Sequence, residues 1–266
     1  MAALATTSGM TRLGLPYNRL GSGAKVAVVF QGLTFAHAPM RGLEARFGLS
    51  MYAFLTHSYT LLILGRRQGL REGTTIAHMA ADYAETIDGE IGAPVDVIGS
   101  STGGSVGLQF AIDHPHLVRR LVVHSSAHAL GPAGKAAQLR VRDLAREGRW
   151  RALSAVLLEM VVPPRPYRAA AVPVGSWLMA TGAPKDPTDM IVTIEAEDRF
   201  DCRADLGRIQ APTLVAAGSD DPFYTTDLFR TTADGIPNGR LALYPNMGHP
   251  ARGRDFERDV LAFLSA

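Results

Sequence analysis

The segment DVIGSSTGGSVGLQFAI, residues 96–112, joins a short apolar stretch to a sequence with helical spacing through a run of small residues. The apolar residues before Gly99 predict a buried strand, and those after Thr102 predict a helix, so the chain must turn sharply between them. Gly99, Ser101 and Gly103 fill the pattern G-x-S-x-G, in which small flanking residues leave the central side chain exposed at the end of the strand. Ser101 is therefore the candidate nucleophile.

Around this segment, short apolar runs alternate with longer stretches of helical spacing. This order is typical of a mainly parallel sheet covered by helices. The candidate strands are residues 25–32, 59–65, 94–99, 121–125, 212–218 and 240–246. The candidate helices are residues 74–91, 102–114 and 252–264. We therefore predict the α/β class, with a mainly parallel twisted sheet flanked by helices.

Residues 129–200 interrupt this alternation, because they contain helical patterns and no candidate strand. We expect a helical insertion after the fourth candidate strand. The prediction is thus a core made of residues 1–128 and 201–266, with residues 129–200 forming a helical cap over it.

Composition indicates one soluble domain that carries an insertion. The chain has 266 residues, of which 47% are hydrophobic and 20% are charged. Its 27 basic and 25 acidic residues are interspersed, which argues against the concentrated basic face that nucleic acid needs. The single Cys202 excludes an internal disulfide.

The first residues, MAALATTSGM, have no positively charged region followed by a long apolar stretch. No uninterrupted apolar run in the chain reaches the ~18 residues of a membrane span. We therefore expect a cytoplasmic protein without stable membrane association. The sequence does not indicate its oligomeric state.

A serine hydroxyl needs a general base to act as a nucleophile, and the base needs an acid to hold its tautomer. Asp220 and Asp221 follow a candidate strand in LVAAGSDDPF, and His249 follows the next strand in LALYPNMGHP. Open α/β sheets place their sites at the carboxyl ends of strands, so these side chains should meet Ser101 there. The order Ser, Asp, His is also that expected for a nucleophile on such a turn.

Over nearly its whole length the sequence resembles the α/β-hydrolase family. The matching stretches are GSG (21–23), FQGL (30–33), GSSTGG (99–104), VRRLVV (118–123), FDCRADLGRIQAPTLVAAGSDDPF (200–223) and NMGHP (246–250). The resemblance implies that Ser101 is the nucleophile and His249 the general base. It favours Asp221 as the acid, because the family acid usually stands three residues after the strand-ending glycine and often before proline. Asp220 would then face solvent or cap a turn.

The resemblance also implies an oxyanion hole of backbone N–H groups. Thr102, at the start of a helix, would donate one, and Leu33, in the loop after the first long strand, would donate the other. Family members commonly have His-Gly before this second donor, whereas this chain has Gln31 and Gly32.

The acidic run EAEDRFDCRAD, residues 195–205, also contains two arginines, so we interpret its acids as structural ion pairs rather than as a cation site. Cys202, within this run, is interpreted as a small packed residue. The histidines outside the candidate triad lack metal-ligand spacing. We expect neither a metal nor another cofactor.

Substrate selection should lie in the insertion. Residues 156–180 are rich in large apolar side chains, and among them we expect Trp177 and Met179 to contact a small, largely apolar substrate. The same residues at helical spacing are equally typical of a cap packed against its own core.

Three functions fit these residues. The first is a serine hydrolase that cleaves a carboxylic ester, lactone or thioester through an acyl-enzyme. The second uses the same triad for carbon–carbon bond cleavage, lyase or acyl-transfer chemistry. The third is a ligand-binding protein with an incidental triad. An intact set of Ser101, Asp221 and His249 favours the first two, and the fold alone does not separate them.

Overall fold

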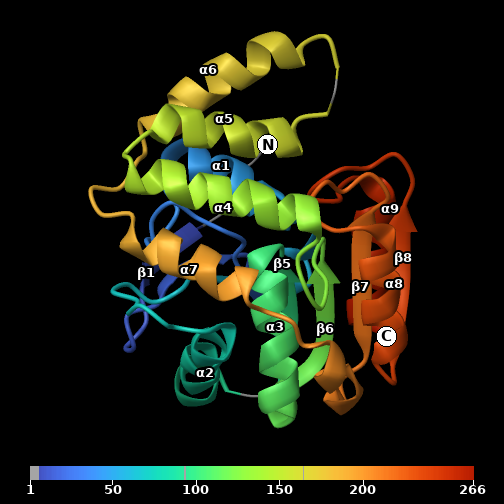
Figure 1. Cartoon of the computed structure of the whole chain (residues 1–266). Coiled ribbons are helices and arrows are strands. Elements are labelled where there is room, and N and C mark those ends of the chain that lie inside the picture. The colour runs from blue at the N-terminus through green and yellow to red at the C-terminus, as the bar shows by residue number, and fades with distance from the viewer. Residues whose placement is uncertain (1–5, 93, 164) are drawn as a thin grey trace.

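The computed structural model describes residues 6–92, 94–163 and 165–266 (Figure 1). Its sheet has eight strands in the order β1-β2-β4-β3-β5-β6-β7-β8. The neighbours from β4 to β8 in this order pair in parallel, whereas β2 pairs antiparallel with both β1 and β4. The predicted α/β class with a mainly parallel sheet is confirmed.

The six candidate strands correspond to the parallel part of the sheet. They are β3 (Lys25–Phe30), β4 (Tyr59–Leu64), β5 (Val95–Ser100), β6 (Val118–His124), β7 (Thr213–Gly218) and β8 (Gly239–Tyr244). The sequence did not predict β1 (Thr6–Met10) or β2 (Pro16–Leu20), which form the antiparallel edge. Strands covered on both faces are apolar along their whole length, so the parallel strands could be recognised in the sequence as apolar runs.

Helices cover both faces of the sheet (Figure 1). On one face, α2 (Ile76–Thr86), α3 (Thr102–Asp113) and α8 (Thr226–Gly235) share a core with the strands. On the other, α1 (Gly42–Ser50) and α9 (Arg254–Ser265) share a second core. The helix α9 buries Phe256, Val260 and Leu264, which recur every four residues and so form one stripe on the helix.

The segment between β6 and β7 contains four longer helices: α4 (Pro132–Arg146), α5 (Trp150–Val161), α6 (Arg168–Ala180) and α7 (Thr188–Asp198). A separate apolar cluster joins α4, α5 and α7 through Val141, Leu144, Leu153, Met190 and Ile194. The helix α6 packs on α5 and lies farthest from the sheet in Figure 1. The segment is therefore layered, with α4 and α7 near the core and α6 outside.

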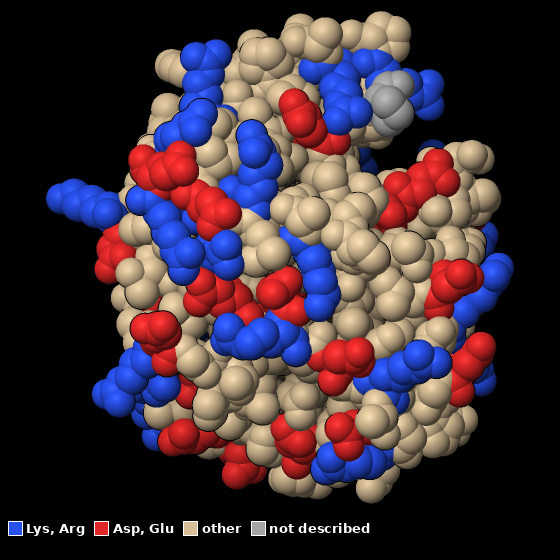
Figure 2. Space-filling view, viewed as in Figure 1, with Lys and Arg blue, Asp and Glu red and all other residues tan. Residues whose placement is uncertain are grey.

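Charges of both signs interleave over the face seen in Figure 2, and neither sign forms an extended field there. In the described part of the chain, the helices are all too short or too polar to cross a membrane.

Candidate active site

The sheet has a topological switch between β3 and β5, because the chain leaves β3 for β4 on one side and reaches β5 on the other. Phe30, the last residue of β3, is level with Gly99 near the end of β5. Loops that follow the two strands therefore diverge at their carboxyl ends, which is where open α/β sheets bind ligands.

Ser101 stands at this edge on a strained turn, with φ 51° and ψ −126°. The turn is possible because its neighbours lack side chains. A Cβ on Gly103 would lie 2.1 Å from the carbonyl oxygen of Phe30, and one on Gly99 would lie 2.5 Å from the carbonyl oxygen of Gly103. The N–H of Ser101 donates to the carbonyl of His124 at 2.9 Å, which ties the turn to β6. Strain of this kind persists only where the surrounding structure fixes it.

Ser101, His249 and Asp221 form a continuous chain of hydrogen bonds. His249 Nε2 lies 3.0 Å from Ser101 Oγ, and His249 Nδ1 lies 2.7 Å from Asp221 Oδ2. A carboxylate only accepts, so Nδ1 carries the ring proton and Nε2 is left to accept from the serine hydroxyl. This is the arrangement that allows the imidazole to take the serine proton.

The two adjacent aspartates differ in environment. Asp221 is buried, and its Oδ1 accepts from the N–H groups of Phe223 at 2.9 Å and Tyr224 at 3.2 Å. Asp220 is exposed and accepts from the Ser219 hydroxyl at 2.8 Å. Only Asp221 contacts His249, whose ring also packs against Phe223 with ring centroids 4.7 Å apart.

His124, at the end of β6, anchors the loop that carries His249. Its Nε2–H donates to the carbonyl of Ala251 at 2.7 Å, and its Nδ1 accepts from the Tyr52 hydroxyl at 2.7 Å. Burial lowers the pKa of His124 to about 4, so its ring is neutral at pH 7. The ring is therefore a fixed support for the loop of His249 rather than a second base.

The two expected oxyanion donors both lie close to Ser101. Thr102 is the first residue of α3, and the first N–H groups of a helix have no partner within it. Within the described residues, the N–H of Leu33 has no acceptor. A Cβ on the preceding Gly32 would lie 3.3 Å from Ser101 Cβ, so this loop runs directly beside Ser101. The Leu33 side chain packs against the apolar cluster of the insertion.

Glu197, near the end of α7, is a site residue that the sequence interpretation missed. Its side chain is fully buried, and it accepts four hydrogen bonds from three segments of the chain. The donors are Thr102 Oγ1 at 2.6 Å, Gln138 Nε2 at 2.9 Å, Ser105 Oγ at 3.1 Å and the Tyr224 hydroxyl at 3.2 Å. Four donors fill the acceptor positions of a carboxylate. Glu197 thus joins α3, α4 and the loop of Asp221.

Other acids of the same run do form ion pairs. Glu195 pairs with Arg146, and Asp205 pairs with Arg208. Cys202 is buried, and burial raises the pKa of its thiol to about 12, so it is protonated at pH 7. The ion-pair interpretation therefore describes these acids but fails for Glu197. The described residues contain no cluster of His, Cys, Asp or Glu that could hold a metal.

Trp177 and Met179 are not brought to the triad. Both lie on α6, the outer helix, where the Trp177 side chain is 60% exposed and Met179 is half-buried. A hollow of about 700 Å³ does lie between α5 and α6, lined by Trp150, Val172, Pro173 and Ser176 among others. It contains no triad residue.

Comparison with known proteins gives the family and the fold. A model of the alpha/beta hydrolase family matches residues 29–261. A protein of Stutzerimonas stutzeri named "Putative carbamate hydrolase RutD" is 29% identical, over 91% of each chain. A 2-hydroxy-6-oxononadienedioate/2-hydroxy-6-oxononatrienedioate hydrolase of a Pseudomonas species is 24% identical, over 97% of this chain and 94% of its own. The enol-lactonase from Burkholderia xenovorans has the same fold, with a TM-score of 0.76 at 20% identity, over 98% of this chain and 100% of its own.

Proposed function

Since the chain belongs to the alpha/beta hydrolase family, we propose that it is a serine hydrolase that cleaves a carboxylic ester, lactone or thioester through an acyl-enzyme. The observation that carries the proposal is the hydrogen-bonded chain from Ser101 Oγ through His249 to Asp221, at 3.0 and 2.7 Å. In both hydrogen bonds the donor and acceptor atoms already lie within the distance that proton transfer requires.

In the first half of this reaction, Ser101 Oγ attacks the substrate carbonyl carbon while its proton passes to His249 Nε2. Asp221 stabilises the resulting imidazolium and keeps Nδ1 protonated. The carbonyl oxygen becomes an oxyanion and accepts from the N–H groups of Leu33 and Thr102. The carbon–oxygen or carbon–sulfur bond then breaks, and the leaving group takes the proton from His249.

In the second half, a water molecule attacks the acyl carbon of the ester on Ser101. His249 accepts the proton of this water and returns it to Ser101 Oγ as the acid product leaves. The oxyanion forms again at the same two N–H groups. The cycle uses no metal and no redox cofactor.

We assign residues 129–200 to a cap over this site, and residues 1–128 and 201–266 to the core. The contacts of Glu197 with α3 and of Leu33 with the apolar cluster of the insertion support that assignment. A largely apolar substrate fits the side chains beside the triad, since Phe223 packs on His249 and Leu33 is half-buried in the adjoining loop.

A second candidate function is hydrolysis of a carbon–carbon bond with the same triad. It is favoured by the relative named as an oxononadienedioate hydrolase. In carbon–carbon bond hydrolysis, the bond that breaks lies next to a ketone carbonyl, and the leaving group is a carbon atom stabilised by conjugation. A carbamate is a further substrate to test, because another relative is named as a putative carbamate hydrolase.

The discriminating experiment offers four substrates side by side: p-nitrophenyl acetate, a small lactone, an aryl carbamate and a vinylogous diketone. The native protein and Ser101→Ala are measured under the same conditions. We expect turnover of the ester or the lactone by the native protein and none by Ser101→Ala. Turnover of the diketone alone would favour the second function. No turnover by either protein would favour a ligand-binding role.

The cytoplasmic location stays a prediction.

A further inference from the structure

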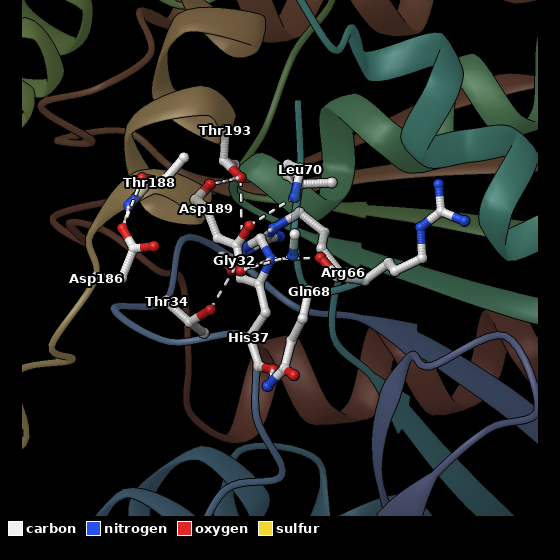
Figure 3. A network of polar contacts seen from close by, with 12 residues as sticks. Gly32, Thr34, His37, Arg66, Gln68, Leu70, Asp186, Thr188, Asp189 and Thr193 are labelled. Carbon is white, nitrogen blue, oxygen red and sulfur yellow. Dashed lines mark hydrogen bonds and ion pairs between the residues drawn. The ribbon is translucent and has the colours of Figure 1, made fainter. Parts of the chain in front are cut away.

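Arg66, just beyond the end of β4, places a buried guanidinium behind the loop that would supply one oxyanion donor (Figure 3). The residue is only 1% exposed. Its Nη1 donates to the carbonyl of Gln31 at 2.8 Å, and its Nη2 donates to the carbonyl of Gly32 at 2.7 Å. One planar group therefore holds two successive carbonyls, a task suited to the rigid fork of arginine.

The orientation of these carbonyls fixes the N–H groups of the loop. The carbonyl of Gly32 belongs to the same peptide group as the N–H of Leu33, and this peptide is trans. In a trans peptide the carbonyl and the N–H point in opposite directions. Because Arg66 binds the carbonyl side, the N–H of Leu33 points away from Arg66. The preceding Gly32 lies beside Ser101, where a Cβ would be 3.3 Å from Ser101 Cβ.

Among the described residues, no counter-ion contacts the charge of Arg66 directly. Within the described ranges, its guanidinium takes part in no salt bridge, and its acceptors are uncharged carbonyl, hydroxyl and imidazole groups. Burial lowers the pKa of Arg66, whereas Tyr83, Glu197 and Asp189 raise it, and an arginine remains charged throughout. Burying a charge without a contacting partner costs several kcal/mol, so such a charge calls for an explanation.

The neighbours of Arg66 hold its side chain in place. His37 Nε2 accepts from Arg66 Nε at 3.3 Å, while His37 Nδ1–H donates to the carbonyl of Arg67 at 2.8 Å. Burial and the charge of Arg66 lower the pKa of His37 to about 3, which keeps the ring neutral and able to accept. From α7, Asp189 accepts from the N–H of Leu70 at 2.7 Å and so fastens the loop that follows Arg66. Figure 3 shows His37, Arg66, Leu70 and Asp189 in one network of polar contacts beside Gly32.

We propose that Arg66 is a positioning residue of the oxyanion hole, which fixes the Gln31–Gly32 and Gly32–Leu33 peptides and places a positive charge behind the Leu33 donor. The proposal rests on the serine-hydrolase function proposed above. A cation on the carbonyl side of a peptide strengthens its N–H as a donor, since hydrogen bonds in a chain polarise one another. A fixed charge near the oxyanion also stabilises it without reorganisation during the reaction.

The test compares Arg66→Met with Arg67→Met. Both changes remove a guanidinium, but the Arg67 side chain is half exposed and pairs with Asp82. The first readout is kcat and KM for p-nitrophenyl acetate. The second is the adduct with an alkyl trifluoromethyl ketone, isotopically labelled at its carbonyl carbon and followed by carbon NMR across pH. Ser101 Oγ adds to that carbon and passes its proton to His249, which leaves an oxyanion whose pKa the chemical shift reports.

We expect Arg66→Met to lower kcat by about tenfold to hundredfold with KM changed less than about twofold, because the oxyanion exists only beyond the ground state. The pKa of the adduct oxyanion should rise by about one unit or more. Arg67→Met should match the native protein in both readouts. A residue that only stabilised the fold would lower the unfolding temperature without moving the oxyanion pKa.

Equal oxyanion pKa values in native protein, Arg66→Met and Arg67→Met would overturn the role of Arg66 while leaving the hydrolase function intact. No adduct in the native protein would instead reject the hydrolase function. Should Arg66→Met fail to fold, Arg66→Lys decides the question, since one ammonium lacks the planar fork that holds both carbonyls. Its kcat should fall by about tenfold and its oxyanion pKa should rise, and native values in both would contradict the proposal.

Discussion

Helices α6 and α7 belong to the same inserted segment but relate to the rest of the molecule in opposite ways. The helix α7 buries Met190, Thr193, Ile194 and Glu197, and its polar atoms contact α3 and the loop after β4. The helix α6 packs on α5 and leaves Val174, Trp177 and Leu178 exposed by 66%, 60% and 45%.

The helices of one inserted segment therefore differ in their relation to the site. Trp177 is large and apolar but exposed, whereas the buried carboxylate of Glu197 has four hydrogen-bond donors and contacts Thr102, the residue after Ser101. A buried polar network fixes one geometry, because any member left unpartnered is costly. We therefore expect α7 to act on catalysis through position, and α6 to contribute little.

The largest loss of kcat should come from a substitution in the core, at Asp221, rather than in helix α6 or α7. Asp221→Asn should lower kcat by about 10,000-fold, because an amide can donate to Nδ1 and so favours the wrong imidazole tautomer. Steady-state rates with p-nitrophenyl acetate check this expectation, with circular dichroism to show that the variant is folded.

The matched control is Asp220→Asn, whose side chain is exposed and does not contact His249. It should keep activity within about twofold of the native protein, as surface changes usually do. If the two variants lost activity in the reverse order, the acid of the triad would have to be reassigned to Asp220.

The next largest effect should come from Glu197→Gln on α7. Glutamine has one accepting oxygen and a donating amide, so two of the four donors around the side chain would lose their acceptor. We expect the free energy of unfolding to fall by about 2–3 kcal/mol. Displacement of Thr102 should lower kcat by about tenfold to hundredfold.

Glu195→Gln is the control on the same helix, because Glu195 forms an ion pair with the half-exposed Arg146. Chemical denaturation and steady-state kinetics should show changes of no more than about 1 kcal/mol and twofold for this variant. Equal effects of the two substitutions would mean that α7 acts only through general stability, and the contrast with α6 would lose its basis.

The smallest effect should come from Trp177→Ala on α6. An exposed side chain that does not reach the triad should change kcat/KM by less than about twofold for p-nitrophenyl acetate, butyrate and octanoate alike. A contact within the acyl pocket would instead be worth about 1–3 kcal/mol and would alter the preference among chain lengths. A tenfold shift in that preference would place α6 at the substrate and break the comparison.

The parallel part of the fold could be predicted because its strands are apolar and short, with turn residues at their ends. The antiparallel strands β1 and β2 could not, since TTSGM and PYNRL lack a run of apolar residues. Strand β2 pairs with β4, a partner about 40 residues later in the chain, and β1 joins the sheet through β2. β-strand preference depends on neighbours of this kind more than on residue type.

Ser101, Asp221 and His249 could be picked out because each follows a different parallel strand, and such strands end at one edge of the sheet. Arg66 and Glu197 could not, because charged residues are ordinarily exposed and nothing in their type indicates burial. The sequence contained one indication that Glu197 is buried. Together with Met190, Thr193 and Ile194 it follows the spacing i, i+3, i+4, i+7 of a buried helix face.

The central claim is that Ser101 is the residue that becomes covalently acylated. It is tested most directly by treating the native protein with a fluorophosphonate, digesting it and locating the adduct by mass spectrometry. We expect one adduct, on Ser101, which is lost in Ser101→Ala and forms much more slowly in Asp221→Asn. Labelling of another residue, or equal labelling of native protein and Ser101→Ala, would contradict it.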